Sequence, residues 1–125
     1  MNLRQDIVNA LTTGLPAGEW KIIGYPSTHT RVEKRTAAVW TSQITPQAGL
    51  GSAYDLEQKI EVTTPYESVE NADDDLDGAL LELLSVLWAM RSITFTSAER
   101  TVSQEGTQHS WTVTVHNILT AVPED

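Results

Sequence analysis

The chain has 125 residues, of which 40% are hydrophobic and 20% are charged, and these proportions predict a single globular domain with its own core. The chain contains no cysteine, which excludes a disulfide scaffold, a thiolate metal site and a thiol nucleophile. The formal net charge of −9 argues against tight nucleic-acid binding, because an acidic surface repels phosphate groups.

The first half of the chain predicts an amphipathic helix followed by three strands. Apolar residues at helical spacing indicate a helix over residues 2–13, which Gly14 and Pro16 end. The strands and their connections follow from period-two patterns and from turn residues. They are expected at residues 20–25, 37–44 and 54–63, with a polar loop over 27–36 and a glycine-containing connection over 45–52.

The third of these strands carries the clearest pattern in the sequence. One row of alternate residues is apolar except for Gln58, and it consists of Tyr54, Leu56, Ile60 and Val62. The other row includes Asp55, Glu57 and Glu61. A period of two predicts one buried face and one solvated, acidic face. We therefore take Asp55, Glu57 and Glu61 as a candidate functional surface.

The second half of the chain predicts a long helix and a hairpin. The helix is expected over residues 73–92, with Asp73 as its N-cap and with Leu80, Leu84 and Leu87 buried. Strands are expected over residues 93–102 and 109–119, joined by a turn that contains Gly106. The predicted order is α-β-β-β-α-β-β. This order belongs to the α+β class, with a mixed sheet of about five strands flanked by the N-terminal helix and one long, largely buried helix.

The sequence contains no motif that predicts a catalytic centre, a metal site or a cofactor. Asp73, Asp75, Asp77 and Gly78 resemble the start of a calcium-binding loop, but Leu84 occupies the twelfth position, where that loop needs a glutamate. The histidines lack the spacing of a zinc site and are expected on the surface; they are His29, His109 and His116. The tryptophans are expected in the core and are Trp20, Trp40, Trp88 and Trp111.

A short basic stretch contrasts with the acidic remainder of the chain. Arg31, Lys34 and Arg35 lie close together in the polar loop. This stretch is either a solvated loop or a docking site for an acidic partner, such as the acidic segment of an identical subunit. We take Arg31, Lys34 and Arg35 as candidate interface residues.

The N-terminal residues lack the basic-then-apolar order of a signal peptide, and no stretch approaches the roughly 20 apolar residues of a membrane helix. We therefore expect the protein to be made in the cytoplasm and to have no membrane segment.

The layout of the whole chain resembles the tail terminator proteins of long-tailed phages, especially those that infect actinobacteria. The resemblance is carried by the N-terminal helix with Leu15 and Pro16, the strand that begins at Trp20, the acidic strand that ends in Thr64 and Pro65, and the final strand that begins at Trp111. The segment Leu-Asp-Gly-Ala-Leu-Leu-Glu-Leu-Leu over residues 76–84 adds to it.

The resemblance implies a structural protein without catalytic residues. Such a protein forms a ring, usually of six copies, that caps the tail tube and offers a surface for joining the head. Its partners would be identical copies, the tail tube protein and a head-completion protein, and its place would be the neck-proximal end of the virion tail. An acidic face that lines a channel would let DNA pass without specific binding.

Other classes of protein remain as alternatives. The nearest is another phage neck, connector or tail-completion component. A metal-dependent hydrolase built on Asp73, Asp75 and Asp77 requires these carboxylates to converge in a pocket. A small acidic binding module would stay monomeric.

Overall fold

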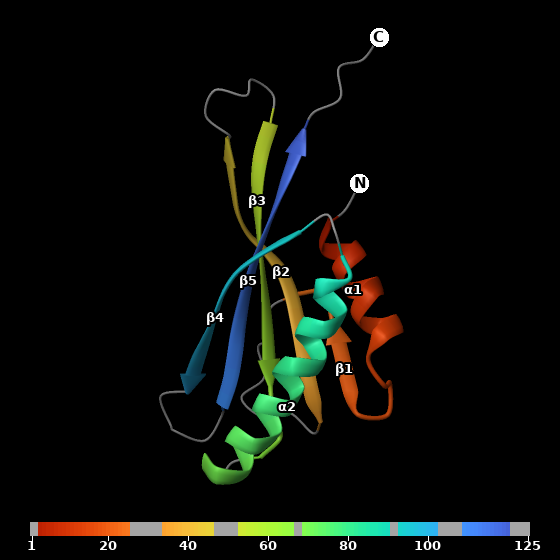
Figure 1. Ribbon diagram of the computed structural model, residues 1–125, viewed down its shortest axis with the longest axis vertical. Helices are drawn as coiled ribbons and strands as arrows, with labels where there is room; N and C mark the ends of the chain where they lie inside the picture. The colour runs from red at the N-terminus through yellow and green to blue at the C-terminus, as the bar shows by residue number, and fades with distance from the viewer. Residues whose placement is uncertain are drawn as a thin grey trace.

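The computed structural model describes residues 3–25, 34–46, 53–66, 69–90, 93–102 and 109–120. Within these residues the chain forms two helices and five strands in the predicted order α-β-β-β-α-β-β (Figure 1). The elements are α1 (Leu3–Gly14), β1 (Trp20–Ile23), β2 (Arg35–Pro46), β3 (Ala53–Thr63), α2 (Val69–Trp88), β4 (Thr94–Val102) and β5 (His109–Thr120). Neither described helix offers an apolar stretch long enough to cross a membrane.

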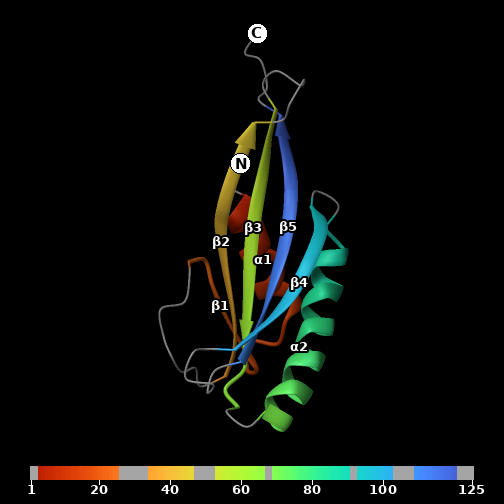
Figure 2. The ribbon, with the colours of Figure 1, turned by 90° about the vertical axis from the view of Figure 1, so that its left-hand side faces the viewer.

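The five strands form one mixed sheet in the order β1-β2-β3-β5-β4. The pairing of β1 with β2 is parallel, and the other three pairings are antiparallel. Both helices lie on the same face of this sheet, and among the described residues no helix or strand covers the other, open face (Figures 1 and 2). The α+β class and the mixed five-stranded sheet are therefore confirmed.

The core lies between the helices and one face of the sheet. Ile7 and Leu11 of α1 are fully buried one turn apart, as their helical spacing predicts. In β3 the predicted inward row supplies Ile60 and Val62, both fully buried. Gln58 is the polar member of that row and is also buried, where its amide and the Thr41 hydroxyl hydrogen-bond each other.

The second helix differs from its prediction in position. It begins at Val69 rather than at residue 73 and ends at Trp88 rather than at residue 92. The prediction that Asp73 is an N-cap is wrong, because Asp73 lies in the second turn. Acidic residues continue from Glu70 through Asp77, so the acidic cluster marks half the helix rather than its first turn.

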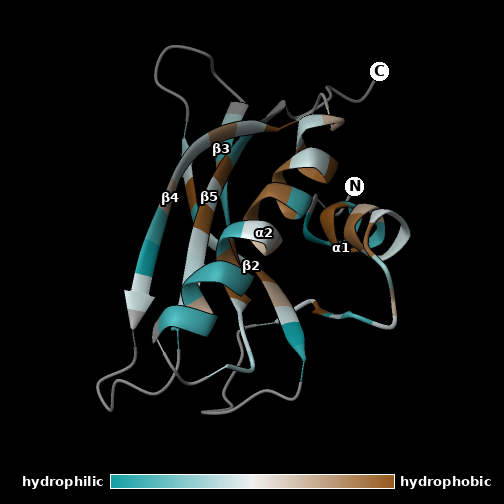
Figure 3. Ribbon diagram, turned by 60° about the horizontal axis from the view of Figure 1, so that its bottom comes forward, coloured by the Kyte–Doolittle hydropathy of each residue, from teal (hydrophilic) through white to brown (hydrophobic). Residues whose placement is uncertain are grey.

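The second helix is also less buried than predicted. Of the three leucines expected in the core, Leu87 is buried, while Leu80 and Leu84 are half-buried at its margin. Leu81 and Trp88 are exposed to 67% and 84%. The apolar stripe of α2 is therefore wider than the sheet surface that covers it. Along α2 the residues change from hydrophilic to hydrophobic toward the C-terminal end (Figure 3).

Several other predictions need correction. The loop expected over residues 27–36 is shorter, because Arg35 and Thr36 already belong to β2. His109 is buried rather than on the surface, and its ring lies beside Arg100. Trp20 is buried as predicted, whereas Trp88 is not. His29 and the turn around Gly106 lie outside the described residues.

Candidate functional site

The open face of the sheet carries the acidic row predicted from the sequence. Asp55, Glu57 and Glu61 alternate along β3 with residues that are buried beneath the helices, so all three point to the open face. Their cross-strand partners on β5 lie on the same face: Glu57 is paired with His116, and Glu61 is paired with Thr112. The row is half-buried rather than fully solvated.

Asp55, Glu57 and His116 form one network of close polar contacts on this face. The Nδ1 atom of His116 lies 2.9 Å from Oδ1 of Asp55, and its Nε2 atom lies 3.5 Å from Oε2 of Glu57. Ser42 of β2 donates a hydrogen bond of 2.6 Å to Oε1 of Glu57. This hydrogen bond lowers the pKa of Glu57, and the charges of Lys59 and His116 lower it further against the opposing effect of burial.

Lys59 and Glu61, the other two charged residues of β3 on this face, have surroundings that differ from those of Glu57. Lys59 donates a hydrogen bond of 2.8 Å to the hydroxyl of Thr114 and lies 3.6 Å from Glu57. Burial raises the pKa of Glu61, because the neighbouring side chains remove water from its carboxylate. The open face is thus acidic in composition, and Asp55, Glu57 and Lys59 are held there by hydrogen bonds and close charge contacts.

The chemistry of this network is electrostatic. Both ring nitrogens of His116 face carboxylates, and the hydroxyl of Ser42 is donated to Glu57 rather than to the imidazole. Activation of a serine requires the imidazole to accept its proton. The observed arrangement instead orients charges across β2, β3 and β5.

The structure separates the three basic candidates. Arg35 extends toward the helices, where its guanidinium forms ion pairs with Asp75 and Glu82 of α2 and lies over the ring of Trp20. Lys34 donates a hydrogen bond of 3.0 Å to the carbonyl of Ala17. Arg31 lies outside the described residues. The acidic partner of Arg35 is therefore in its own chain.

The three aspartates that a hydrolase would require have separate surroundings. Asp73 is paired with Arg100 of β4, whereas Asp75 accepts hydrogen bonds from Arg35 and Thr64. Asp77 is exposed. All three belong to one continuous helix, and within the described part of the chain no group of acidic and histidine side chains is placed to hold a metal ion.

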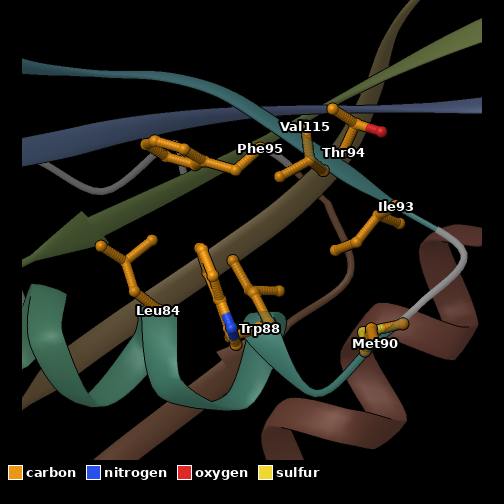
Figure 4. Close-up of a pocket in the computed structure, with 8 residues that line it drawn as sticks. Leu84, Trp88, Met90, Ile93, Thr94, Phe95 and Val115 are labelled. Atoms are coloured by element: carbon orange, nitrogen blue, oxygen red, sulfur yellow. The ribbon is translucent and has the colours of Figure 1, made fainter.

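An apolar groove that the sequence analysis missed lies between the end of α2 and strand β4. It encloses about 640 Å³. Leu84 and Trp88 extend from α2 toward the strand that carries Phe95, and Met90, Ile93 and Val115 complete its apolar lining (Figure 4). Trp88 and Phe95 are exposed to 84% and 44%.

The groove had only a weak signal in the sequence. Apolar residues continue past the end of the helix through Met90, Ile93 and Phe95, where a solvated connection would be polar. That signal does not show whether another element covers these residues. Whether they form a groove depends on the position of β4 relative to the end of α2.

Comparison with known proteins identifies no relative of the chain, since no protein-family model and no curated protein matches it.

Proposed function

We propose that this protein is a structural subunit of a phage tail, in which a ring of identical copies caps the tail tube and offers the head-joining surface. The proposal places the protein in the virion, at the neck-proximal end of the tail, after synthesis in the host cytoplasm. Its partners would be identical copies, the tube protein and a head-completion protein. It assigns no catalytic residue, cofactor or metal to the chain.

The observation that carries this proposal is the uncovered apolar groove. Trp88 is exposed to 84%, and it lies with Phe95 and Leu84 in one continuous apolar surface. Exposed apolar surfaces of this kind are typical of protein–protein contacts, where aromatic residues contribute most of the binding energy. A subunit that works inside an assembly needs such a surface, whereas a solitary acidic binding module does not.

The charge distribution gives further support. Asp55, Glu57 and Glu61 lie on the sheet face that the helices leave open. If that face lines the channel of the ring, its carboxylates repel the phosphates of DNA and keep the DNA from adhering. The network of His116, Ser42 and Lys59 would hold the carboxylates of Asp55 and Glu57 in place.

The experiment that tests the proposal is co-sedimentation of the purified protein with phage tail tubes and, separately, with DNA-filled heads. We expect the protein to bind the tube end in a complex of several copies per tube, measured by mass spectrometry and by electron microscopy of labelled protein. Binding to head portals in preference to tubes would favour another neck component. A monomer that binds neither particle contradicts the proposal.

A matched pair of variants distinguishes binding through the groove from nonspecific association through any exposed aromatic residue. Trp88→Ser removes the most exposed aromatic residue of the groove, while Tyr25→Ser removes an aromatic residue that is exposed to 61% near β1, at the other edge of the sheet. We expect only Trp88→Ser to abolish the multi-copy complex.

A further inference from the structure

The strands β2, β3 and β5 extend well beyond the two helices (Figures 1 and 2). We use the name distal arm for the outer parts of two of them, residues Thr41–Pro46 of β2 and Ala53–Leu56 of β3. Every β2 residue of the arm is exposed. The arm therefore adds length and exposed surface to the subunit, while Leu56, at its inner end, packs against the core.

The distal arm carries apolar side chains on one side. Ile44 is paired with Leu56 and Pro46 with Tyr54, so these four residues share a face. Ile44 and Tyr54 are exposed to 61% and 41%. This face continues the helix side of the sheet past the end of the helices (Figure 1), and Leu56, at its inner end, packs against the core.

The arm is held away from the groove of its own chain. Each β3 residue of the arm is paired with β5, from Ala53 with Thr120 to Leu56 with Asn117. Folding the arm back onto α2 would break these pairs. Each subunit therefore has an apolar projection and an apolar groove that cannot fill one another.

The two surfaces are also the neutral parts of an acidic chain. Residues 36–54 contain no charged side chain, and the one charged residue of the arm, Asp55, lies on the face opposite Ile44 and Tyr54. Between Glu82 and Glu99, the span that provides most of the groove, the only charged residue in the sequence is Arg91. Two chains of net charge −9 repel one another, and contact through uncharged surfaces keeps that repulsion smallest.

We infer that the distal arm of one subunit docks in the groove of the next, with Ile44 and Tyr54 against Trp88, Leu84 and Phe95. The occupant of the groove is thus a second copy of this chain. Because the arm and the groove are different surfaces, the contact is head-to-tail, and head-to-tail contacts close into rings when the rotation between subunits permits. This inference rests on the proposed ring and names the contact that would close it.

Disulfide trapping tests the contact directly, because the natural chain contains no cysteine. An Ile44→Cys copy and a tagged Phe95→Cys copy are mixed and oxidised mildly, and the mixed dimer is measured on non-reducing gels. We expect the mixed dimer to exceed by about tenfold the dimer obtained when Tyr25→Cys replaces Ile44→Cys. Tyr25 is a suitable control because its exposed fraction equals that of Ile44, 61%.

A second measurement follows self-association by analytical ultracentrifugation. Ile44→Ser and Trp88→Ser should each weaken self-association by about tenfold or more, the effect expected of central interface residues. Their circular dichroism should match that of the natural protein, because both side chains are largely exposed and contribute little to folding. Tyr25→Ser should leave self-association unchanged.

The outcomes separate this inference from the proposed function. Subunits that assemble on tail tubes but give no more mixed dimer than the Tyr25→Cys control would overturn the inference and leave the proposed function standing. An efficient mixed dimer in a protein that ignores tail tubes would support the contact and overturn the tail function. Absence of the mixed dimer at every protein concentration would overturn the inference.

Discussion

The guanidinium of Arg35, at the start of β2, lies 2.9 Å from the carboxylate of Asp75 in the middle of α2. Asp75 also accepts a hydrogen bond of 2.7 Å from the hydroxyl of Thr64. Glu82, two turns further along α2, binds the same guanidinium. One cation thus fixes the helix against the start of β2, and it uses two of the acidic residues that give the chain its charge.

Replacement of Arg35 by methionine should destabilise the fold by about 2 kcal/mol, because Asp75 and Glu82 lose a partly buried partner to which they are hydrogen-bonded. Lys34→Ala is the matched control, since the Lys34 ammonium only reaches an exposed carbonyl, and it should change stability by less than about 0.5 kcal/mol. Urea unfolding at neutral pH measures the free energy of unfolding of both variants. Equal stability of the two variants would show that the ion pairs contribute nothing.

This relationship also changes how an interface at the basic stretch is tested. Charge reversal at Arg35 would place a third acid beside Asp75 and Glu82, so a loss of assembly would follow from damage to the subunit. Lys34→Glu examines the same stretch while leaving the Arg35 ion pairs in place.

The close approach of α1 to α2 predicts an effect at Gly14. A Cβ atom added at Gly14 would lie 2.7 Å from a methyl group of Val86, which is closer than side chains tolerate. We expect Gly14→Ala to destabilise the protein by about 1–3 kcal/mol, even though alanine favours helices. Thermal unfolding measures the change.

Two further variants control for this effect. Val86→Ala in the Gly14→Ala background should recover part of the loss, because it removes the methyl groups that the new Cβ meets. Gly18→Ala has open space around the added atom and should be nearly neutral. A Gly14→Ala variant that is more stable than the natural protein would contradict the close packing of α1 against α2.

The two glutamates of the open face should have opposite effects on the pH dependence of stability. Burial raises the pKa of Glu61 above its ordinary value of 4.5, so the folded state binds this proton more readily than the unfolded state. The charged form then destabilises the fold at neutral pH, and Glu61→Gln should be stabilising there. Its advantage should shrink as the pH falls through the raised pKa toward 4.5, because the natural carboxyl becomes neutral too.

Glu57 provides the opposite case. The hydrogen bond from Ser42, with the charges of Lys59 and His116, lowers its pKa below 4.5, so its contribution to stability is present above 4.5 and is lost as the pH falls through the lowered value. Glu57→Gln should therefore be destabilising at neutral pH and nearly neutral in strong acid. Urea unfolding of both variants between about pH 3 and pH 7 checks the signs. Parallel curves for the two variants would contradict the account of this face.

Hydrophobic periodicity was enough to predict the order of the elements and the inward row of β3, because each strand or helix shows its buried face in its own residues. The same reasoning failed at α2. Its apolar stripe includes Leu81 and Trp88, yet burial depends on how far the sheet extends over the helix, and that is a property of other segments. The prediction that His109 is exposed was wrong for a related reason, because the residues beside it in the sheet determine its burial.

Of the candidate functional surfaces, the acidic row followed from alternation alone. The groove did not, because it exists only where the end of α2 meets β4. Arg35 is predicted as an interface residue in a loop, but it lies in β2, and its acidic partners are forty and forty-seven residues away in the sequence. Pairing over that separation is set by topology, which no local pattern contains.

The register shift at Ser42 decides which way the distal arm faces. Before it, Ala37, Val39 and Thr41 lie on the helix side, and after it Ile44 lies there, because Ser42 is an extra residue between the pairs Thr41 with Gln58 and Gln43 with Glu57. Without this bulge Ser42 would pair with Glu57 and Ile44 with Asp55, so Ile44 would face the acidic side while the core half of β2 kept its register. A single bulged residue thus sets which side chains the outer part of the arm presents on the helix side, while the buried half of β2 keeps the same residues in the core.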